Sequence, residues 1–173
     1  MKAKRSLVAG RLAVVLVGMG LMAAAPAAMA QLLTFMFIDG IPGESTLIDK
    51  RDWIELTGYS QSFGTSNCSR AVANKRIDRS SPLLISRAAA NQLIPSVIVT
   101  MRKAGEAQRD FFIATLGQVL VDRIEVADQD GQLVERVVLA PQSITIQYFP
   151  QDPKGGLGTP VVSSVACNPG RNK

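Results

Sequence analysis

The sequence contains no histidine and only two cysteines among its 173 residues. Without histidine the chain cannot build a Ser-His-Asp triad, a Cys-His pair, a histidine general base or a histidine-ligated zinc site. Two cysteines are also too few for a thiolate zinc site. A serine assisted by a lysine stays open in principle, but no spacing supports one. We therefore expect a non-enzymatic protein with no cofactor and no metal.

Acidic residues are missing from the first part of the chain, where none precedes Asp39. The first eleven positions hold four of the 19 basic residues, namely Lys2, Lys4, Arg5 and Arg11. Removing those four leaves 15 basic residues against 14 acidic ones, so the net charge of +5 belongs mostly to this leader. A nearly neutral remainder lacks the basic surface of nucleic-acid-binding domains, and we expect no nucleic-acid partner.

Residues 1–30 have the three zones of a secretory signal. The basic start is followed by an apolar run over 12–25 and then by small residues, with Ala28 and Ala30 at positions −3 and −1. This pattern predicts cleavage before Gln31 and a secreted or periplasmic protein without a stable membrane anchor. The alternative is an uncleaved anchor, since residues 12–30 are uncharged and approach the roughly 20 residues that span a bilayer. Pro26 and the lack of a charged stop flank favour cleavage.

Export would place the two cysteines, Cys68 and Cys167, in an oxidising compartment, where thiols can form a disulfide. A bond between them would tie the end of the chain to an early loop and contribute about 4–5 kcal/mol by restricting the unfolded chain. No spacing rule links the two positions. Two unpaired thiols, or thiols bonded to a partner, stay open as the alternative.

After the leader, apolar residues recur mainly with a period of two, in short segments separated by turn residues, which is typical of β-strands. The run 33–38 is apolar throughout, which predicts a strand covered on both faces. Residues 64–74 are polar and small, which predicts a loop or an exposed edge. Asp128 to Gly131 predict a hairpin turn. The other expected strands are 53–63, 96–102, 109–116, 119–127, 134–139 and 144–149.

One segment changes period and predicts the only substantial helix, over 82–93. Ser81 can cap it and Pro82 suits its first position. We expect Leu83, Leu84 and Leu93 to pack against a sheet. Two basic clusters are expected to be solvated charge on strand edges: Lys75, Arg76 and Arg79, and Arg102 with Lys103. Together the strands and helix predict a mainly β fold, with a barrel domain over 31–152 and a Gly/Pro-rich tail over 153–173.

Seven segments share their order and spacing with one known family: 35–45 (FMFIDGIPGES), 48–49, 53–64, 77–84 (IDRSSPLL), 102–105 (RKAG), 116–121 and 144–151. Together they resemble the Hcp family, the haemolysin-coregulated proteins that form the inner tube of type VI secretion systems. The resemblance covers about residues 35–156.

The resemblance implies a closed barrel of two antiparallel sheets with one short flanking α-helix. It also implies a homo-oligomer, a hexameric ring that stacks into a hollow tube, with a spike at the tip, effectors in the lumen and no catalytic residue. In stacking, one ring contacts the next through unlike faces, and the series of rings never returns to the first one, so further rings can always be added. We place this ring-stacking contact in the long early loop, at Gly64, Thr65, Ser66, Asn67, Ser69 and Arg70.

The leader departs from the family pattern, because tube proteins of this family are normally loaded from the cytoplasm without a cleavable signal. Three interpretations stay open. The chain is an exported protein that forms rings in the periplasm or outside the cell, or an exported β module that kept the fold and lost the tube, or its start is misassigned and lies nearer Met29. A monomeric exported binding module is therefore the rival to a self-associating structural protein.

Overall fold

The computed structural model describes residues 31–64, 70–105, 109–152 and 156–167, and the leader lies outside these ranges. The described residues form a mainly β fold with one α-helix, α1 (Ser81–Ala89), and one short 3-10 helix, η1 (Ile48–Lys50). The strands are β1 (Leu32–Ile38), β2 (Ile54–Leu56), β3 (Gly58–Ser60), β4 (Ala71–Arg76), β5 (Ile94–Lys103), β6 (Asp110–Gln129), β7 (Gln132–Tyr148) and β8 (Val161–Ala166). The expected fold class is confirmed.

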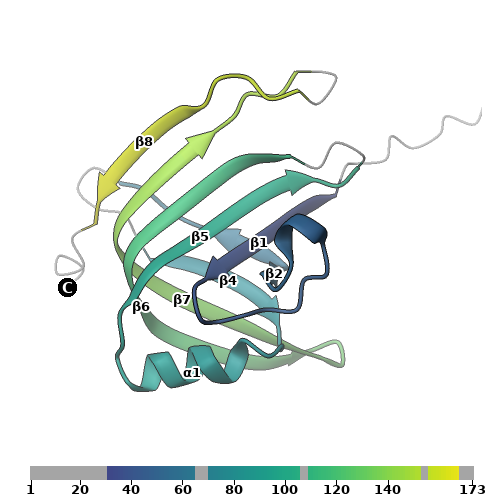
Figure 1. The fold of residues 1–173 in the computed structure, drawn as a ribbon. Coiled ribbons are helices and arrows are strands. Elements are labelled where there is room, and N and C mark those ends of the chain that lie inside the picture. Colours follow the sequence, from purple (N-terminus) through teal and green to yellow (C-terminus); the bar gives the residue numbers. More distant parts are fainter. Residues whose placement is uncertain (1–30, 65–69, 106–108, 153–155, 168–173) are drawn as a thin grey trace, which may run out of the picture.

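The strands form one curled antiparallel sheet in the order β2-β1-β5-β6-β7-β4-β3, with β8 paired to the far part of β7 (Figure 1). The two ends of this order meet because β2 and β3 are consecutive in the chain. β2 pairs with β1, β3 pairs with β4, and the Thr57 N–H between them donates to the Asn74 carbonyl at 2.8 Å. This connection, and not a ladder of hydrogen bonds between β2 and β3, therefore joins the two ends of the sheet. The two sheets that were expected are one continuous sheet.

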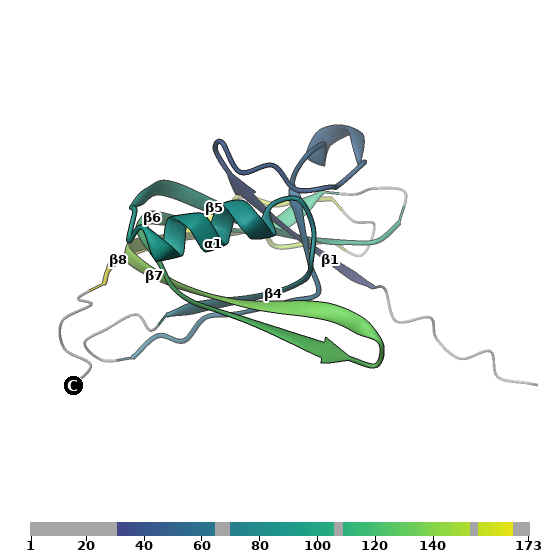
Figure 2. The same cartoon turned by 90° about the horizontal axis from the view of Figure 1, so that it is seen from below.

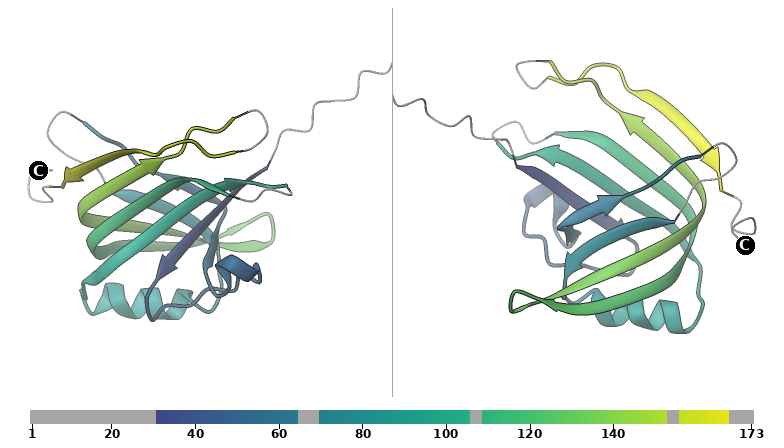
Figure 3. Two further views of the ribbon diagram at one scale, coloured as in Figure 1. Left: turned by 45° about the horizontal axis from the view of Figure 1, so that its top comes forward. Right: turned by 180° about the vertical axis from the view of Figure 1, so that it is seen from behind.

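β6 and β7 are long strands that serve both walls of the barrel (Figure 3). Each was expected as two shorter strands, but the chain bends instead of breaking. In β6, Gln118 adopts a positive φ of 50° and the register shifts between Val121 and Arg123, which is the geometry of a bulge. The predicted hairpin turn is confirmed, with positive φ at Asp130 and Gly131.

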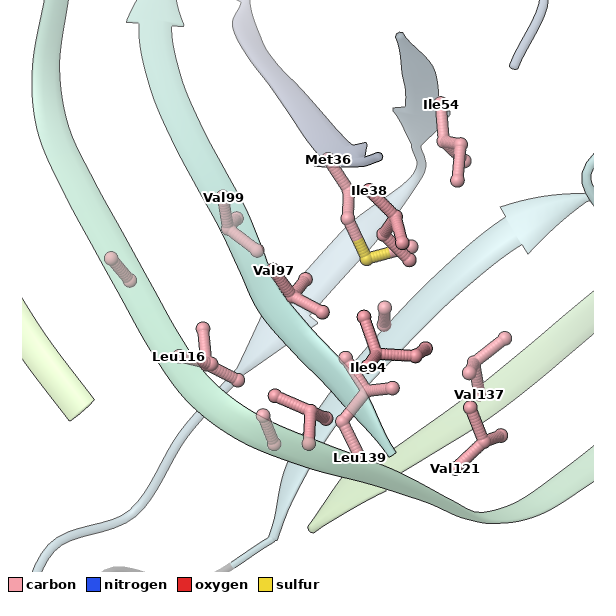
Figure 4. Close-up of a cluster of buried hydrophobic side chains, with 14 of the residues drawn as sticks. Met36, Ile38, Ile54, Ile94, Val97, Val99, Leu116, Val121, Val137 and Leu139 are labelled. Atoms are coloured by element: carbon pink, nitrogen blue, oxygen red, sulfur yellow. The ribbon is translucent and has the colours of Figure 1, made fainter. Parts of the chain in front are cut away.

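The core lies inside the curl of the sheet (Figure 4). Met36 pairs with Val99 and Ile38 with Val97, so these four fully buried side chains share the inner face of β1 and β5. Complete burial of such a side chain contributes about 1.5–3 kcal/mol. Helix α1 crosses the lower end of the barrel and adds Leu84 to this core (Figure 2).

The helix differs from its prediction at both ends. It stops at Ala89 because Asn91 takes the left-handed conformation that ends helices, with φ 49°. A helix of nine residues buries only one stripe, so Leu84 packs inside while Leu83 and Leu93 are 41% and 45% exposed. The prediction that all three leucines pack against the sheet is therefore wrong for two of them.

Two strands lie where the sequence predicted other structure. β4 begins inside the segment 64–74, which was expected to be a loop or an exposed edge, yet Ala71 and Ala73 are fully buried. β4 lies between β3 and β7, where their methyl groups fit the core. β8 lies within the segment expected as a tail, and all six of its residues are exposed. Neither segment has the apolar alternation that indicates a half-buried strand.

A buried ionic network joins the start of α1 to β4 and β7. Lys75 and Glu135 are register partners, and Lys75 Nζ lies 2.9 Å from Glu135 Oε2 and 2.8 Å from Asp78 Oδ1. Ser81 Oγ contacts both, at 2.8 Å from Lys75 Nζ and 2.5 Å from Glu135 Oε2. Ser81 therefore serves this network and makes no capping bond. The prediction that Lys75 is solvated is wrong, since its side chain is fully buried.

Replacing Lys75 by methionine should lower the free energy of unfolding by about 3–5 kcal/mol, because Glu135 is left as an unpaired buried charge. Urea unfolding measures the loss. Adding Glu135→Gln to Lys75→Met removes that charge and should restore part of the stability. A loss below about 1 kcal/mol in the single variant would show that the network does not stabilise the fold.

Candidate assembly surface

The connection between β1 and β2, residues 39–53, runs beside β1 and contains η1 (Figure 1), and its ion pairs reach the outer face of β1 and β5. We call this connection the strap. That face carries Phe35 on β1 and Thr100 and Arg102 on β5, with Phe35 and Thr100 directly paired. All three are nearly inaccessible to solvent although they point away from the core. β1 is therefore covered on both faces at Phe35, as its apolar run predicted, whereas Phe37 on the same outer face is 37% exposed.

Asp110 joins the strap to the sheet by bridging two buried cations. Its Oδ1 accepts from Arg102 Nε at 2.7 Å and its Oδ2 accepts from Lys50 Nζ at 2.6 Å. Arg102 also donates from Nη2 to Asp49 Oδ2 at 2.7 Å. Arg102 is buried, so the expectation that it is solvated charge is wrong. It is held by carboxylates from the strap and from the neighbouring strand β6.

Aromatic contacts reinforce the same attachment. Lys50 Nζ lies 3.7 Å from the centroid of the Trp53 ring, close enough for a cation–π interaction. The Trp53 ring lies 5.2 Å from that of Phe37 on β1, within the usual range for aromatic pairs. The end of the strap is thus packed onto the sheet by the same lysine that pairs with Asp110.

Arg79, just before α1, holds the middle of the strap. Its guanidinium donates to the Gly43 carbonyl and to Asp52, and its backbone N–H donates to Glu44 Oε1 at 3.1 Å. Gly43 lies so close to the segment before β2 that an added Cβ would meet the Trp53 carbonyl oxygen at 2.3 Å. Only glycine fits this approach, so the path of the strap is fixed along its length.

The strap presents one large apolar side chain to solvent. Ile48 is 93% exposed, and it follows Leu47 at the start of η1, whose next two residues, Asp49 and Lys50, are held by their ion pairs. A fixed backbone that displays a bare isoleucine is suited to contact with another molecule, because little ordering is needed on binding. The sequence carried no signal for this, since an isoleucine in an apolar pattern is normally buried.

Eight of the other large exposed apolar side chains lie on elements at opposite ends of the barrel. At the lower end in Figure 1, α1 and the β6–β7 turn region carry Leu83, Ile85, Val126 and Leu133. At the upper end, β8 and the end of β7 carry Val161, Val162, Val165 and Tyr148. The chain therefore offers two separate surfaces, which is what a head-to-tail contact requires.

Most of the sequence-predicted site residues cannot be placed. Ala28, Ala30 and the stretch 65–69, which holds Cys68 and most of the predicted stacking loop, lie outside the described residues. The flanking Gly64 and Arg70 are exposed, and Arg70 pairs with Asp122 at 2.8 Å.

The two remaining site residues lie at the two ends of the described chain. Gln31 is exposed directly before β1. Cys167 is 7% exposed and belongs to the core, and its N–H donates to the Gln142 carbonyl.

The described part of the chain offers little for catalysis. No three potential metal-ligating side chains come together there, and no helix in it has the length and apolarity to cross a bilayer. A cleft of about 460 Å³ is lined mainly by residues of β1 and β2, with Glu55 and Arg76 among them. Lys75 and Ser81 do lie at hydrogen-bond distance, but both are buried, so a substrate cannot reach them.

Comparison with known proteins matches residues 35–148 to the family described as "Type VI secretion system effector, Hcp". The chain belongs to the Hcp family. The match covers every described strand of the barrel except β8, together with the strap and α1.

Individual Hcp proteins agree with this assignment. Protein hcp1 of Pseudomonas aeruginosa is 34% identical over 84 residues, which are 47% of this chain and 52% of the relative, so the chain matches about half the length of that protein. The structure of Hcp1 from Salmonella typhimurium is 26% identical, with a TM-score of 0.70 over 80% of this chain and 95% of its own. A further type six secretion system protein, 22% identical over 79% of this chain and 96% of its own, has the same fold, with a TM-score of 0.72.

The attachment of the strap should weaken in acid. The hydrogen bond from Arg102 holds the pKa of the Asp49 carboxyl below its ordinary value of 3.8. A depressed folded-state pKa contributes stability that is present above the ordinary value and is lost as the pH falls through the folded value. The free energy of unfolding should therefore differ between the parent chain and Asp49→Asn near neutral pH, and this difference should vanish in acid.

Urea unfolding of both proteins between neutral pH and pH of about 2 measures this difference. Asp39→Asn is the control for removing an exposed carboxylate that makes no ion pair within the described residues. A difference between parent and Asp49→Asn that stays constant down to the lowest pH would contradict the coupling.

Proposed function

We propose that this Hcp protein is a non-enzymatic structural subunit that associates with copies of itself into a ring of the type VI inner-tube kind. The observation that carries the proposal is the pair of separate apolar surfaces at opposite ends of the barrel, beside the strap that holds Ile48 in solvent. A contact between unlike surfaces of identical subunits gives rings when it closes and filaments when it does not. By family resemblance, the ring is hexameric, stacks onto further rings, meets a spike protein and carries effectors in its lumen.

The rival is a monomeric exported binding module with the same fold. Its supporting observation is the leader, which would place the chain outside the compartment where a type VI tube is built. Under both alternatives, cleavage before Gln31 delivers a secreted or periplasmic protein without a membrane anchor. The two proposals differ in whether the exposed apolar surfaces meet a second copy of the chain or another molecule.

Light scattering on the oxidised chain 31–173 separates these alternatives. We expect a mass several times that of one subunit, which falls on dilution. Ile48→Asp should lower the oligomer fraction at least tenfold, because a charge is placed in an apolar contact at a cost of more than about 1.4 kcal/mol. Ile48→Val keeps an apolar side chain and should assemble like the parent chain.

The fold of each variant is checked by circular dichroism, since the exposed side chain of Ile48 contributes little to packing. A monomer at every concentration of the parent chain would refute the self-association. If Ile48→Asp and Ile48→Val assembled equally, the strap would not be part of the contact between subunits.

We also propose that Cys68 and Cys167 form an intramolecular disulfide in the exported protein. Cys167 supports this because it is held in the core next to the end of β8, where a bond would secure a strand that has no buried residue of its own. Replacing both cysteines by alanine should lower the free energy of unfolding by about 4–5 kcal/mol, since 99 positions separate them.

The direct measurement is a count of free thiols in the unfolded protein before and after reduction, together with peptide mapping. We expect none before reduction and two afterwards, with the linked peptides coming from one chain. Equal counts, or a bond that joins two chains, would contradict the proposal.

A further inference from the structure

We propose that Gln31 is a modification site, at which the mature amino terminus closes on its own side chain to form pyroglutamate. The inference rests on the proposed cleavage before Gln31, which turns this residue from an internal one into one with a free α-amine. A terminal glutamine carries both reacting groups, and they lie at the spacing of a five-membered lactam. Whether the ring forms depends on whether the fold leaves the amine and the carboxamide free.

The position of Gln31 directly before β1 leaves both groups free. Its carbonyl oxygen accepts the Ala104 N–H at 2.8 Å, and the next residue, Leu32, pairs with Lys103. The chain is therefore held from the carbonyl of Gln31 onward, while the atoms before it lie outside the ladder. The residue is exposed, and its carboxamide makes no hydrogen bond within the described ranges.

The reaction consumes only groups that the sheet does not use. The α-nitrogen bonds to the side-chain carbonyl carbon, the bond from that carbon to the carboxamide nitrogen breaks, and this nitrogen leaves as ammonia with a proton from the amine. The backbone carbonyl held by Ala104 is unchanged. Atoms and electrons balance without an oxidant, a reductant or a further reactant, so the folded and exported chain can complete the step alone.

The charges around the new terminus also favour the ring. The attacking amine must be neutral, and an ordinary α-amine loses its proton at a pH of about 7.7–8. Lys103 is the register partner of Leu32, so the charged residue across the ladder from the new terminus is a cation rather than a carboxylate. Glu55 and Arg76 are the other charged groups in the adjoining cleft, and they pair with each other at 3.7 Å. No unpaired carboxylate of that cleft stabilises an ammonium at Gln31.

Cyclisation would change the rim of the cleft of about 460 Å³ that Gln31 helps to line. Export creates a positive charge there, and lactam formation removes it and leaves a compact neutral ring beside apolar residues such as Leu33 and Leu56. The mature chain would also lack the free amine that aminopeptidases require. The modification thus suits a protein that works outside the cell.

The experiment uses the full-length chain, expressed with its leader and purified from the exported fraction. Intact mass and N-terminal peptide mapping, after labelling of free amines, identify the first residue and its state. We expect a first peptide that begins at position 31, is lighter by one ammonia and carries no label on its α-nitrogen. A synthetic peptide of residues 31–36, taken through the same steps, measures cyclisation caused by handling.

Two variants sharpen the result. Gln31→Ser keeps a small polar residue after the cleavage site but cannot form the lactam, so its first peptide should take the label. Gln31→Glu must expel water rather than ammonia and should stay mostly open. Both variants leave the bond from the carbonyl of residue 31 to Ala104 in place.

Three outcomes would overturn the inference. An open, labelled Gln31 after prolonged incubation at neutral pH would show that the amine is not free to react while cleavage stands. Lactam at no more than the level of the synthetic peptide would assign it to handling. A first residue other than 31 would remove the inference together with the proposed cleavage, and the peptide map distinguishes this case from the other two.

Discussion

The outer layer of this protein depends on the carboxylate of Asp110, which binds two buried cations at once. Arg102 belongs to β5 and Lys50 to the strap, so one side chain of β6 joins the neighbouring strand to a segment 60 positions earlier in the chain. Burying such charges is costly, and the arrangement is stable only because each carboxylate oxygen has its own partner. Beneath this ionic layer, the inner face of β1 and β5 is mainly apolar, with Met36, Ile38, Val97 and Val99 fully buried. β1 therefore lies between a polar attachment and the core.

Sequence reasoning succeeded where one local pattern decides the structure. The mainly apolar run of β1 indicated a strand covered on both faces, which holds in its middle though not at Phe37, and Asp130-Gly131 indicated a turn with positive φ. It failed where a distant partner decides. In the sequence, Arg102 and Lys75 resemble solvated charges. In the fold, Asp110 lies opposite Arg102 and Glu135 lies opposite Lys75 on the neighbouring strands. β8 carries no periodic signal at all, because neither of its faces is buried.

Membership of the Hcp family explains why the informative features are surfaces rather than a pocket. In the assembly proposed above, a subunit would act through the shape and rigidity of the faces that it offers. Here that rigidity has identifiable causes: the close approach at Gly43, the hydrogen bonds of Arg79 and the ion pairs of the strap. None of these features lies in a single motif. The candidate surface could therefore be recognised only after the fold had brought the strap, α1 and β5 together.

The asymmetric covering of the barrel has a consequence for anything built from it. Helix α1 crosses one mouth, whereas β8 extends the wall at the other (Figure 1). A column of such subunits would be polar, because its first and last members would expose different elements, α1 at one end and β8 at the other. In such a column, elongation would be open to arrest at one end alone, by a molecule that recognises only the helix or only the strand.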